Sequence, residues 1–196
     1  SSQKVGATVA DDVTRKAFIA VIISLVVMFV YIAIRFRRWQ YGVSSIVCLA
    51  HDTLLVIGMY SLFNNILPFT MEVNQSFIAA VLTIIGYSIN NTVVIFDRVR
   101  ENVNLFPKKG WKERFNSANN STLLRTINTS GTTIVVLLAI FIFGGETIRG
   151  FVFALLVGMI AGTFSSLFIA SPLAYALFKG KKYDEELEQV ADKKRK

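Results

Sequence analysis

The sequence predicts an all-α integral membrane protein, built as a bundle of five transmembrane helices. Hydrophobic residues make up 53% of the 196 residues, and the mean hydropathy is +0.52. Five apolar runs are each long enough to cross a bilayer, which takes about 20 residues in a helix. They lie at residues 17–36, 42–63, 77–96, 126–143 and 151–178, and the last is long enough that we expect it to tilt or bend. A soluble all-α core is the alternative interpretation of such runs.

The basic residues are concentrated in alternate connections, and this predicts the orientation of the chain. The net charge is +8, and most of the 21 Lys and Arg follow the first run, lie between the third and fourth, or follow the fifth. Lys and Arg are enriched in cytoplasmic loops, so we expect a cytoplasmic loop at 97–124 and a charged cytoplasmic tail at 179–196. The lead-in at 1–16 is then extracytoplasmic. This topology accounts for the charge without nucleic-acid binding.

Part of the predicted loop has the pattern of an amphipathic helix. Trp111 and Phe115 fall on one face of the segment Trp111–Phe115, with charged residues between them. Such a segment either lies in the membrane interface or forms a solvated helix.

The third run carries many hydrogen-bonding side chains for a helix in lipid. Tyr87 and Asn91 are four residues apart and share a helix face, and Asn90 lies on its flank. Ser88 and Thr92 form a second pair with the same spacing. A polar group without a partner in hydrocarbon costs several kcal/mol, so this face must point into the bundle or at water. It forms either a helix–helix contact or part of an ion pathway.

The fourth run begins beside an arginine. Arg125 is followed on the same face by Thr129. Because Asn91 lies about 9 Å inside the cytoplasmic end of its helix, the two side chains are expected to meet in the cytoplasmic half of the bundle. The alternative is that Arg125 extends to the lipid headgroups.

Two ionisable residues lie in the middle of the second run. His51 and Asp52 are about ten residues from either end of it. Ionisable groups at this depth must be paired or hydrated, and they mark proton pathways in many transporters. The alternative is a static pair that holds helices together.

A charge cluster follows the third run, at the expected cytoplasmic mouth. It consists of Asp97, Arg98, Arg100 and Glu101. The alternative interpretation is an ordinary solvated helix end.

Small residues recur every four positions along the fifth run. They include Gly158, Gly162 and Ser166. A ladder of this kind lets another helix backbone approach closely and slide. Pro172 is expected to bend the same helix near its inner end.

The sequence offers no constellation of a catalytic enzyme. It has no phosphate-binding glycine loop, and one His and one Cys do not supply the usual zinc ligand sets. We therefore expect no metal site, no cofactor and no enzymatic activity.

Four motifs together resemble the SecF family, half of the SecD/SecF protein-export machinery in the resistance-nodulation-division superfamily. They are LTIIGYSINNTVVIFDRVRE at 82–101, LAHDTLL at 49–55, STLLRTINTSGTT at 121–133 and FGGETIRGF at 143–151. The resemblance covers nearly the whole chain. It implies the C-terminal five-span portion of a SecF-type six-helix half, which sits in the bacterial inner membrane.

The resemblance also implies partners and a role. The partners are a SecD half or subunit, the SecYEG channel, SecA and the translocating preprotein. The role is late-stage preprotein export driven by the proton or sodium gradient. An efflux transporter of the same superfamily, for a small molecule or lipid, and a structural scaffold without ion coupling are the alternatives.

One position departs from the family pattern. The family has SINDTVV, with the aspartate proposed as the proton carrier, whereas this chain has Asn91 there. Asparagine is similar in shape but cannot titrate. Either Asn91 imitates a permanently protonated aspartate in an engineered variant, or it is native and the proton carrier lies elsewhere.

Overall fold

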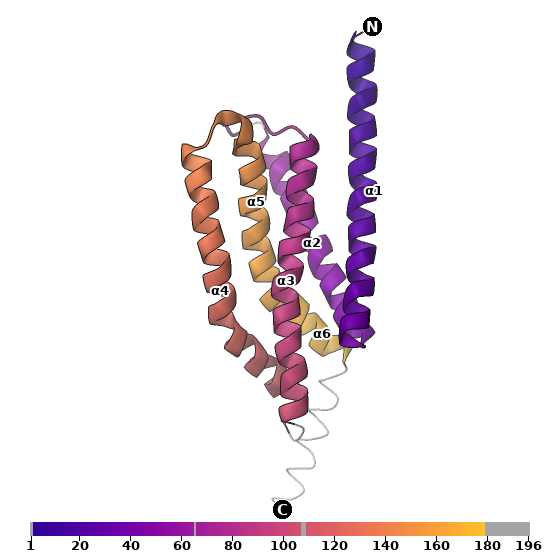
Figure 1. The fold of residues 1–196 in the computed structure, drawn as a ribbon, viewed down its shortest axis with the longest axis vertical. Helices are drawn as coiled ribbons and strands as arrows, with labels where there is room; N and C mark the ends of the chain where they lie inside the picture. Colours follow the sequence, from indigo (N-terminus) through magenta and orange to yellow (C-terminus); the bar gives the residue numbers. More distant parts are fainter. Residues whose placement is uncertain (1, 65, 107–108, 179–196) are drawn as a thin grey trace, which may run out of the picture.

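The computed structural model describes residues 2–64, 66–106 and 109–178, with side chains from Arg15 onward. All regular structure in this part of the chain is helical, and the helices form one bundle (Figure 1). Five helical segments are long and apolar enough to cross a membrane. The predicted all-α fold with five spans is therefore confirmed.

The helices are longer than the apolar runs that predict them. They are α1 (Ser2–Phe36), α2 (Trp39–Phe63), α3 (Gln75–Leu105), α4 (Trp111–Phe143), α5 (Glu146–Ser165), a π-helical segment (Ser166–Ala170) and α6 (Ser171–Leu177). The expected loop at 97–124 is thus mostly helical, because α3 continues to Leu105 and α4 begins at Trp111. The segment Trp111–Phe115 is the start of α4, and Phe115 is buried in the bundle instead of lying free in the interface.

The two central helices are α3 and α5. They are the most buried of the five spans, and α1 is the most exposed. Figure 1 shows α4 on one side of this pair and α2 and α1 on the other, with the N-terminal part of α1 extending beyond the bundle. The buried polar side chains described below project from α2, α3, α4 and α5 toward this centre.

Small residues let α5 approach α3 closely. Gly158 and Gly162 are both buried. A Cβ on Gly158 would overlap the side chain of Ile84 on α3. The backbones of α3 and α5 therefore meet at a separation that a larger side chain at Gly158 would prevent.

The last span changes direction at its π-helical segment. Pro172 has no N–H, and its ring crowds the carbonyl four residues earlier, at Phe168 inside that segment. Insertions of this type bend helices. Beyond it, α6 runs toward the turn between α1 and α2 (Figure 1).

Aromatic side chains lock the end of the bundle at which α6 finishes. We call this group the aromatic end cluster, and it comprises Phe36, Tyr41, Phe96, Trp111, Phe115, Tyr175 and Phe178. Its members come from five helical elements and from the residue after α6. The cluster therefore ties the ends of all five spans together.

We expect Gly158→Ala to lower the stability of the bundle. The new Cβ would lie 2.7 Å from Cγ2 of Ile84 and closer still to Cδ1 and Cγ1. Overpacking of a buried site costs about 1–3 kcal/mol. The matched control is Gly86→Ala, because nothing lies within 4 Å of the Cβ position at Gly86.

Thermal unfolding in detergent checks this ranking. Gly158→Ala should unfold below the wild type. Gly86→Ala should unfold at or above it, since alanine favours a helix over glycine by about 0.5–1 kcal/mol. Equal losses in both variants would show that the α3–α5 contact at Gly158 is not tight.

Candidate functional site

A buried carboxyl group joins α2 to α3 within the spans. The Oγ of Ser88 donates a hydrogen bond of 2.6 Å to Oδ2 of Asp52. On the other side, Nδ1 of His51 lies 3.1 Å from Oδ1. The side chain of Asp52 is 1% exposed, whereas that of His51 is 41% exposed. The pair therefore extends from the interior of the bundle to its surface.

Glycine on α5 completes the cover over this carboxyl group. A Cβ on Gly162 would lie 3.0 Å from Cβ of Ser88 and 3.4 Å from Oδ2 of Asp52. The backbone of α5 therefore rests directly on the Ser88–Asp52 hydrogen bond. One turn from Asp52, the thiol of Cys48 lies beside Ser165 and Thr92.

His51 lines an apolar groove on the outside of α2. The groove has a volume of about 610 Å³, and its other lining residues are Val47, Ala50, Leu54 and Leu55. The imidazole is the polar member of this set. It connects the buried carboxyl group of Asp52 to the exposed groove on the outer face of α2.

A second buried polar layer joins α3, α4 and α5 around one hydroxyl group. The Oγ of Ser130 accepts hydrogen bonds from the hydroxyl of Tyr87 at 3.3 Å and from Nδ2 of Asn91 at 3.5 Å. It also shares a hydrogen bond of 2.8 Å with the hydroxyl of Thr163. Ser130 is 1% exposed and Asn91 4%. We call the four residues the Ser130 node.

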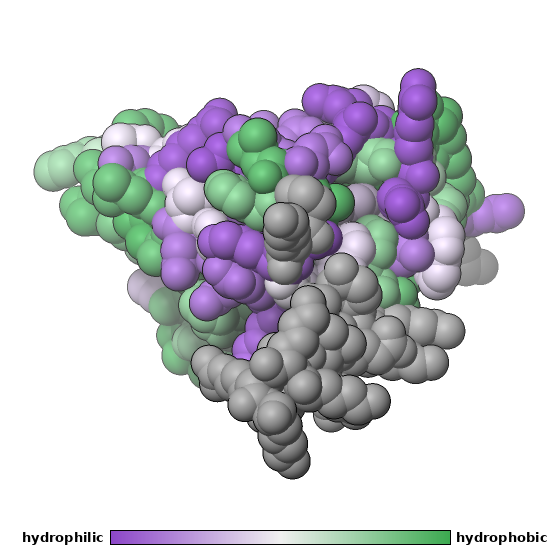
Figure 2. Space-filling view, turned by 90° about the horizontal axis from the view of Figure 1, so that it is seen from below, coloured by the Kyte–Doolittle hydropathy of each residue, from purple (hydrophilic) through white to green (hydrophobic). Residues whose placement is uncertain are grey.

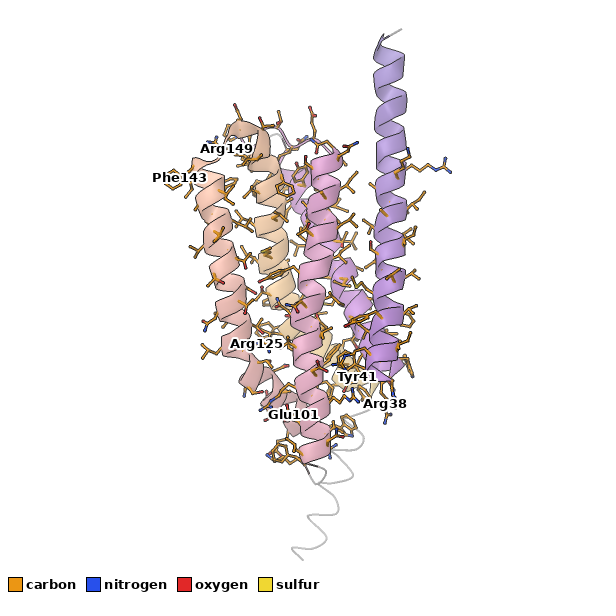
Figure 3. All side chains as sticks on the ribbon, in the orientation of Figure 1. Arg38, Tyr41, Glu101, Arg125, Phe143 and Arg149 are labelled. Carbon is orange, nitrogen blue, oxygen red and sulfur yellow. The ribbon has the colours of Figure 1, made fainter. Side chains whose placement is uncertain are left out.

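The expected meeting of Asn91 with Arg125 is not found in the described chain. Asn91 contacts Ser130, and Arg125 is exposed on the lower half of α4 (Figure 3). Ser130 and Arg125 are five residues apart, so their side chains leave the helix about 140° apart. If Ser130 faces Asn91, Arg125 must face away.

Polar residues instead line an exposed face of α4. They are Arg125, Asn128, Thr129 and Thr132, which we call the exposed polar stripe. Their spacing places them on one helix face. On α3, Asn90 is exposed as well. Lipid does not satisfy side chains such as Arg125 and Asn128, so this surface faces protein or water, or Arg125 extends to the lipid headgroups.

The charge cluster at the end of α3 is partly paired. Arg98 donates to Glu101 at 2.6 Å and to Oγ of Ser121 at 3.1 Å. Asp97 pairs with Arg35 of α1 at 3.4 Å. Arg100 is exposed and has no ion pair with any described residue.

The remaining predicted residues occupy packing positions. Thr92 is buried and donates to the carbonyl of Ser88 at 3.2 Å, and Ser166 is buried at the start of the π-helical segment. Over the described ranges, no group of three or more His, Cys, Asp or Glu could hold a metal ion.

Sequence reasoning did not single out Ser130 or Thr163. Isolated hydroxyl residues are common in apolar helices because they bond to the carbonyl one turn earlier, as Thr163 does with Met159. A spacing search along one helix could not find them, since the Ser130 node forms between helices.

Comparisons with known proteins identify the family of this chain. The family described as "Protein export membrane protein SecD/SecF, C-terminal" matches residues 1–180. Protein translocase subunit SecF of Rhodothermus marinus is 50% identical over 173 residues, covering 88% of this chain and 56% of that protein. Subunit SecF of Sebaldella termitidis is 44% identical over 179 residues, or 91% of this chain and 56% of that protein.

Fused proteins match as well. Protein translocase subunit SecDF of Thermus thermophilus is 40% identical over 185 residues, covering 94% of this chain and 24% of that protein. A crystal structure of SecDF in its super-membrane-facing form matches with a TM-score of 0.76 and 41% identity, covering 89% of this chain and 23% of that chain. The present chain spans about half the length of the SecF relatives and about a quarter of the fused ones.

We expect Ser130→Ala to destabilise the bundle by about 1–2 kcal/mol, because a hydrogen bond between membrane helices contributes about 0.6 kcal/mol on average and the hydroxyl of Ser130 takes part in three. The substitution leaves the amide of Asn91 without its acceptor and frees the hydroxyl of Tyr87. Thr132→Ala on the same helix is the control, because that hydroxyl bonds only to backbone carbonyls of α4. Chemical unfolding in detergent measures both, and an unchanged Ser130→Ala variant would contradict a role for the node in holding the three helices.

Proposed function

The chain belongs to the SecD/SecF C-terminal family of protein-export membrane proteins, and on this premise we propose that it is the five-helix membrane portion of an auxiliary translocase subunit. This subunit uses the proton or sodium gradient to help drive late-stage preprotein export across the bacterial inner membrane. The observation that carries the proposal is the family match over residues 1–180, with 50% identity to a protein named translocase subunit SecF.

The proposed partners are a SecD half or subunit, the SecYEG channel, SecA and the emerging preprotein. The fused SecDF relatives support the first of these. The exposed polar stripe on α4 is a candidate surface for this partner, because a protein there could satisfy Arg125 and Asn128. In the proposed topology the start of α1 is extracytoplasmic, and the turn after α1 and the tail after α6 are cytoplasmic.

Asp52 is the proposed proton carrier of this chain. It is the acidic residue buried within the described spans, whereas Asn91 cannot titrate. The groups that face it are His51 and, one turn away, Cys48 from α2, Ser88 from α3 and Gly162 from α5. Among the described residues, α3 and α5 bring no charged group against it. His51 offers a route for a proton between Asp52 and the outer face of α2.

Protonation of Asp52 would change how α2, α3 and α5 fit together. A neutral carboxyl group can donate as well as accept, so its hydrogen bond with Ser88 can rearrange. Gly162 lies against both groups, and a shift there moves α5 relative to α3. The Ser130 node lies next along α3 and α5 and passes the movement to α4. The small-residue face of α5 permits such sliding.

The alternative is that this subunit is a structural scaffold of the translocase that does not couple to ions, and it predicts a different result for neutral replacements. It requires the same packing but no titrating group. Under it, neutral replacements of Asp52 or Arg125 would leave export unchanged as long as the protein folds. The efflux alternative has less support, because the relatives that match are named translocase subunits.

We expect Asp52→Asn to abolish the gradient-dependent part of export and leave the rest. The full-length protein carrying this chain is expressed in cells lacking their own copy, and secretion of a preprotein is followed with and without the proton gradient. Asp52→Glu should restore part of the effect, because it keeps a carboxyl group. Glu146→Gln, which removes an exposed carboxylate at the start of α5, should behave as wild type.

The same assay with Asn91→Asp separates the two accounts of position 91. If the chain with Asn91 already supports gradient-dependent export, the carrier lies elsewhere, as proposed. If only Asn91→Asp does so, position 91 is the carrier and Asp52 is not. If no variant responds to the gradient although all restore export, the scaffold account holds.

A further inference from the structure

A partly enclosed pocket lies at the end of the bundle that carries the aromatic end cluster. Its volume is about 180 Å³, equal to roughly six molecules of liquid water at about 30 Å³ each. The lining residues that decide its chemistry are Arg38, Tyr41, Arg100, Asn104, Trp111 and Phe178. They come from the α1–α2 turn, from α2, α3 and α4, and from the residue after α6. No carboxylate lines this pocket among the described residues.

The pocket carries two positive charges that no carboxylate of the described residues neutralises. The two carboxylates of α3 are already paired, Asp97 with Arg35 and Glu101 with Arg98. Neither Arg38 nor Arg100 forms an ion pair with a described residue. Both guanidinium groups line the same pocket as Tyr41. Figure 3 shows Arg38 and Tyr41 at the same end of α1 and α2.

Contacts between aromatic rings hold the walls of the pocket in place. The centroid of Tyr41 lies 4.7 Å from that of Phe96 and 4.9 Å from that of Phe178. Trp111 stacks on Phe178 at 5.1 Å, with 13° between the ring planes. The pocket is therefore preformed, and a ligand would not need to order its aromatic side.

The pocket lies next to the ends of three apolar runs. Phe36 and Phe178 line it and are the last residues of the first and fifth runs, and Arg100 lies four residues after the third run ends at Phe96. A position just beyond the apolar runs corresponds to the level of the lipid headgroups. Tyrosine and tryptophan side chains, which also line the pocket, mark the membrane–water interface. Figure 2 looks onto this end of the bundle and shows hydrophilic residues gathered on it.

We propose that this pocket binds the phosphodiester of an anionic phospholipid. Arg38 and Arg100 bind the phosphate oxygens, since guanidinium groups match phosphate geometry with paired donors. The hydroxyl of Tyr41 donates a further hydrogen bond, and the rings of Trp111 and Phe178 pack against the glycerol and first acyl carbons. A zwitterionic headgroup fits less well, because it would bring a cation beside two guanidinium groups.

The test is lipid retention by the full-length protein that carries this chain. The protein is reconstituted in nanodiscs of equal phosphatidylglycerol and phosphatidylcholine, extracted gently, and analysed by native mass spectrometry for bound lipid. Wild type should retain phosphatidylglycerol over phosphatidylcholine. Arg38→Gln/Arg100→Gln should reduce that preference about tenfold or more. Both positions are exposed, so the variant is expected to fold, and helical circular dichroism checks that it does.

The control is Arg37→Gln, because Arg37 is adjacent to Arg38 but does not line the pocket. It should retain phosphatidylglycerol as wild type does. An equal loss in Arg37→Gln would show general attraction to a basic surface and overturn the proposal. So would a wild type without preference for phosphatidylglycerol, or displacement of the lipid by millimolar inorganic phosphate at constant ionic strength, which would show that the pocket takes free phosphate.

Discussion

The structure depends on how a carboxyl group is accommodated inside a membrane. Asp52 is almost fully buried, and its two oxygens are held by Ser88 from α3 and His51 from α2. An unpaired charge in this environment is expensive, so these contacts require α2 and α3 to stay together. Gly162 then allows α5 to close over the hydrogen bond. The contact of α2 with the two central helices, α3 and α5, is organised around this carboxyl group.

The other features of the bundle are arranged along the helices that meet at this point. The Ser130 node links α3 and α5 to α4, and the π-helical segment that follows α5 begins four residues after Gly162. That segment leads through α6 into the aromatic end cluster, which joins the ends of all five spans. Packed side chains therefore connect Asp52 with the outer helix α4 and with the aromatic end cluster. Such a connection is consistent with a small motion spread through the domain, and coupling itself requires two distinct packings.

Some of this architecture could be predicted from the sequence, and some could not. The lengths of the apolar runs predicted the five spans, because the thickness of a bilayer fixes the length of a helix that crosses it. The position of His51 and Asp52 in the middle of an apolar run identified them as candidate functional residues. Ionisable side chains are costly in hydrocarbon unless they are paired or hydrated. The pairing of Asn91 was not predictable, because it depends on how α4 is rotated about its axis, which sequence spacing within one helix does not determine. Ser130 supplied the contact that Arg125 was expected to make, and the helical continuation through residues 97–105 and 111–124 was missed because those turns are polar.

The most direct test of the account is whether Asp52 exchanges a proton inside the bilayer. Infrared difference spectra of the full-length protein in lipid vesicles, recorded between acidic and alkaline buffers, report protonated carboxyl groups. We expect a carboxylic-acid band that changes with pH in the wild type and is missing from Asp52→Asn, with a shifted position in Ser88→Ala because the hydrogen bond to the carboxyl group is lost. Identical spectra from wild type and Asp52→Asn would contradict the account, because the buried carboxyl group would then be a fixed structural element.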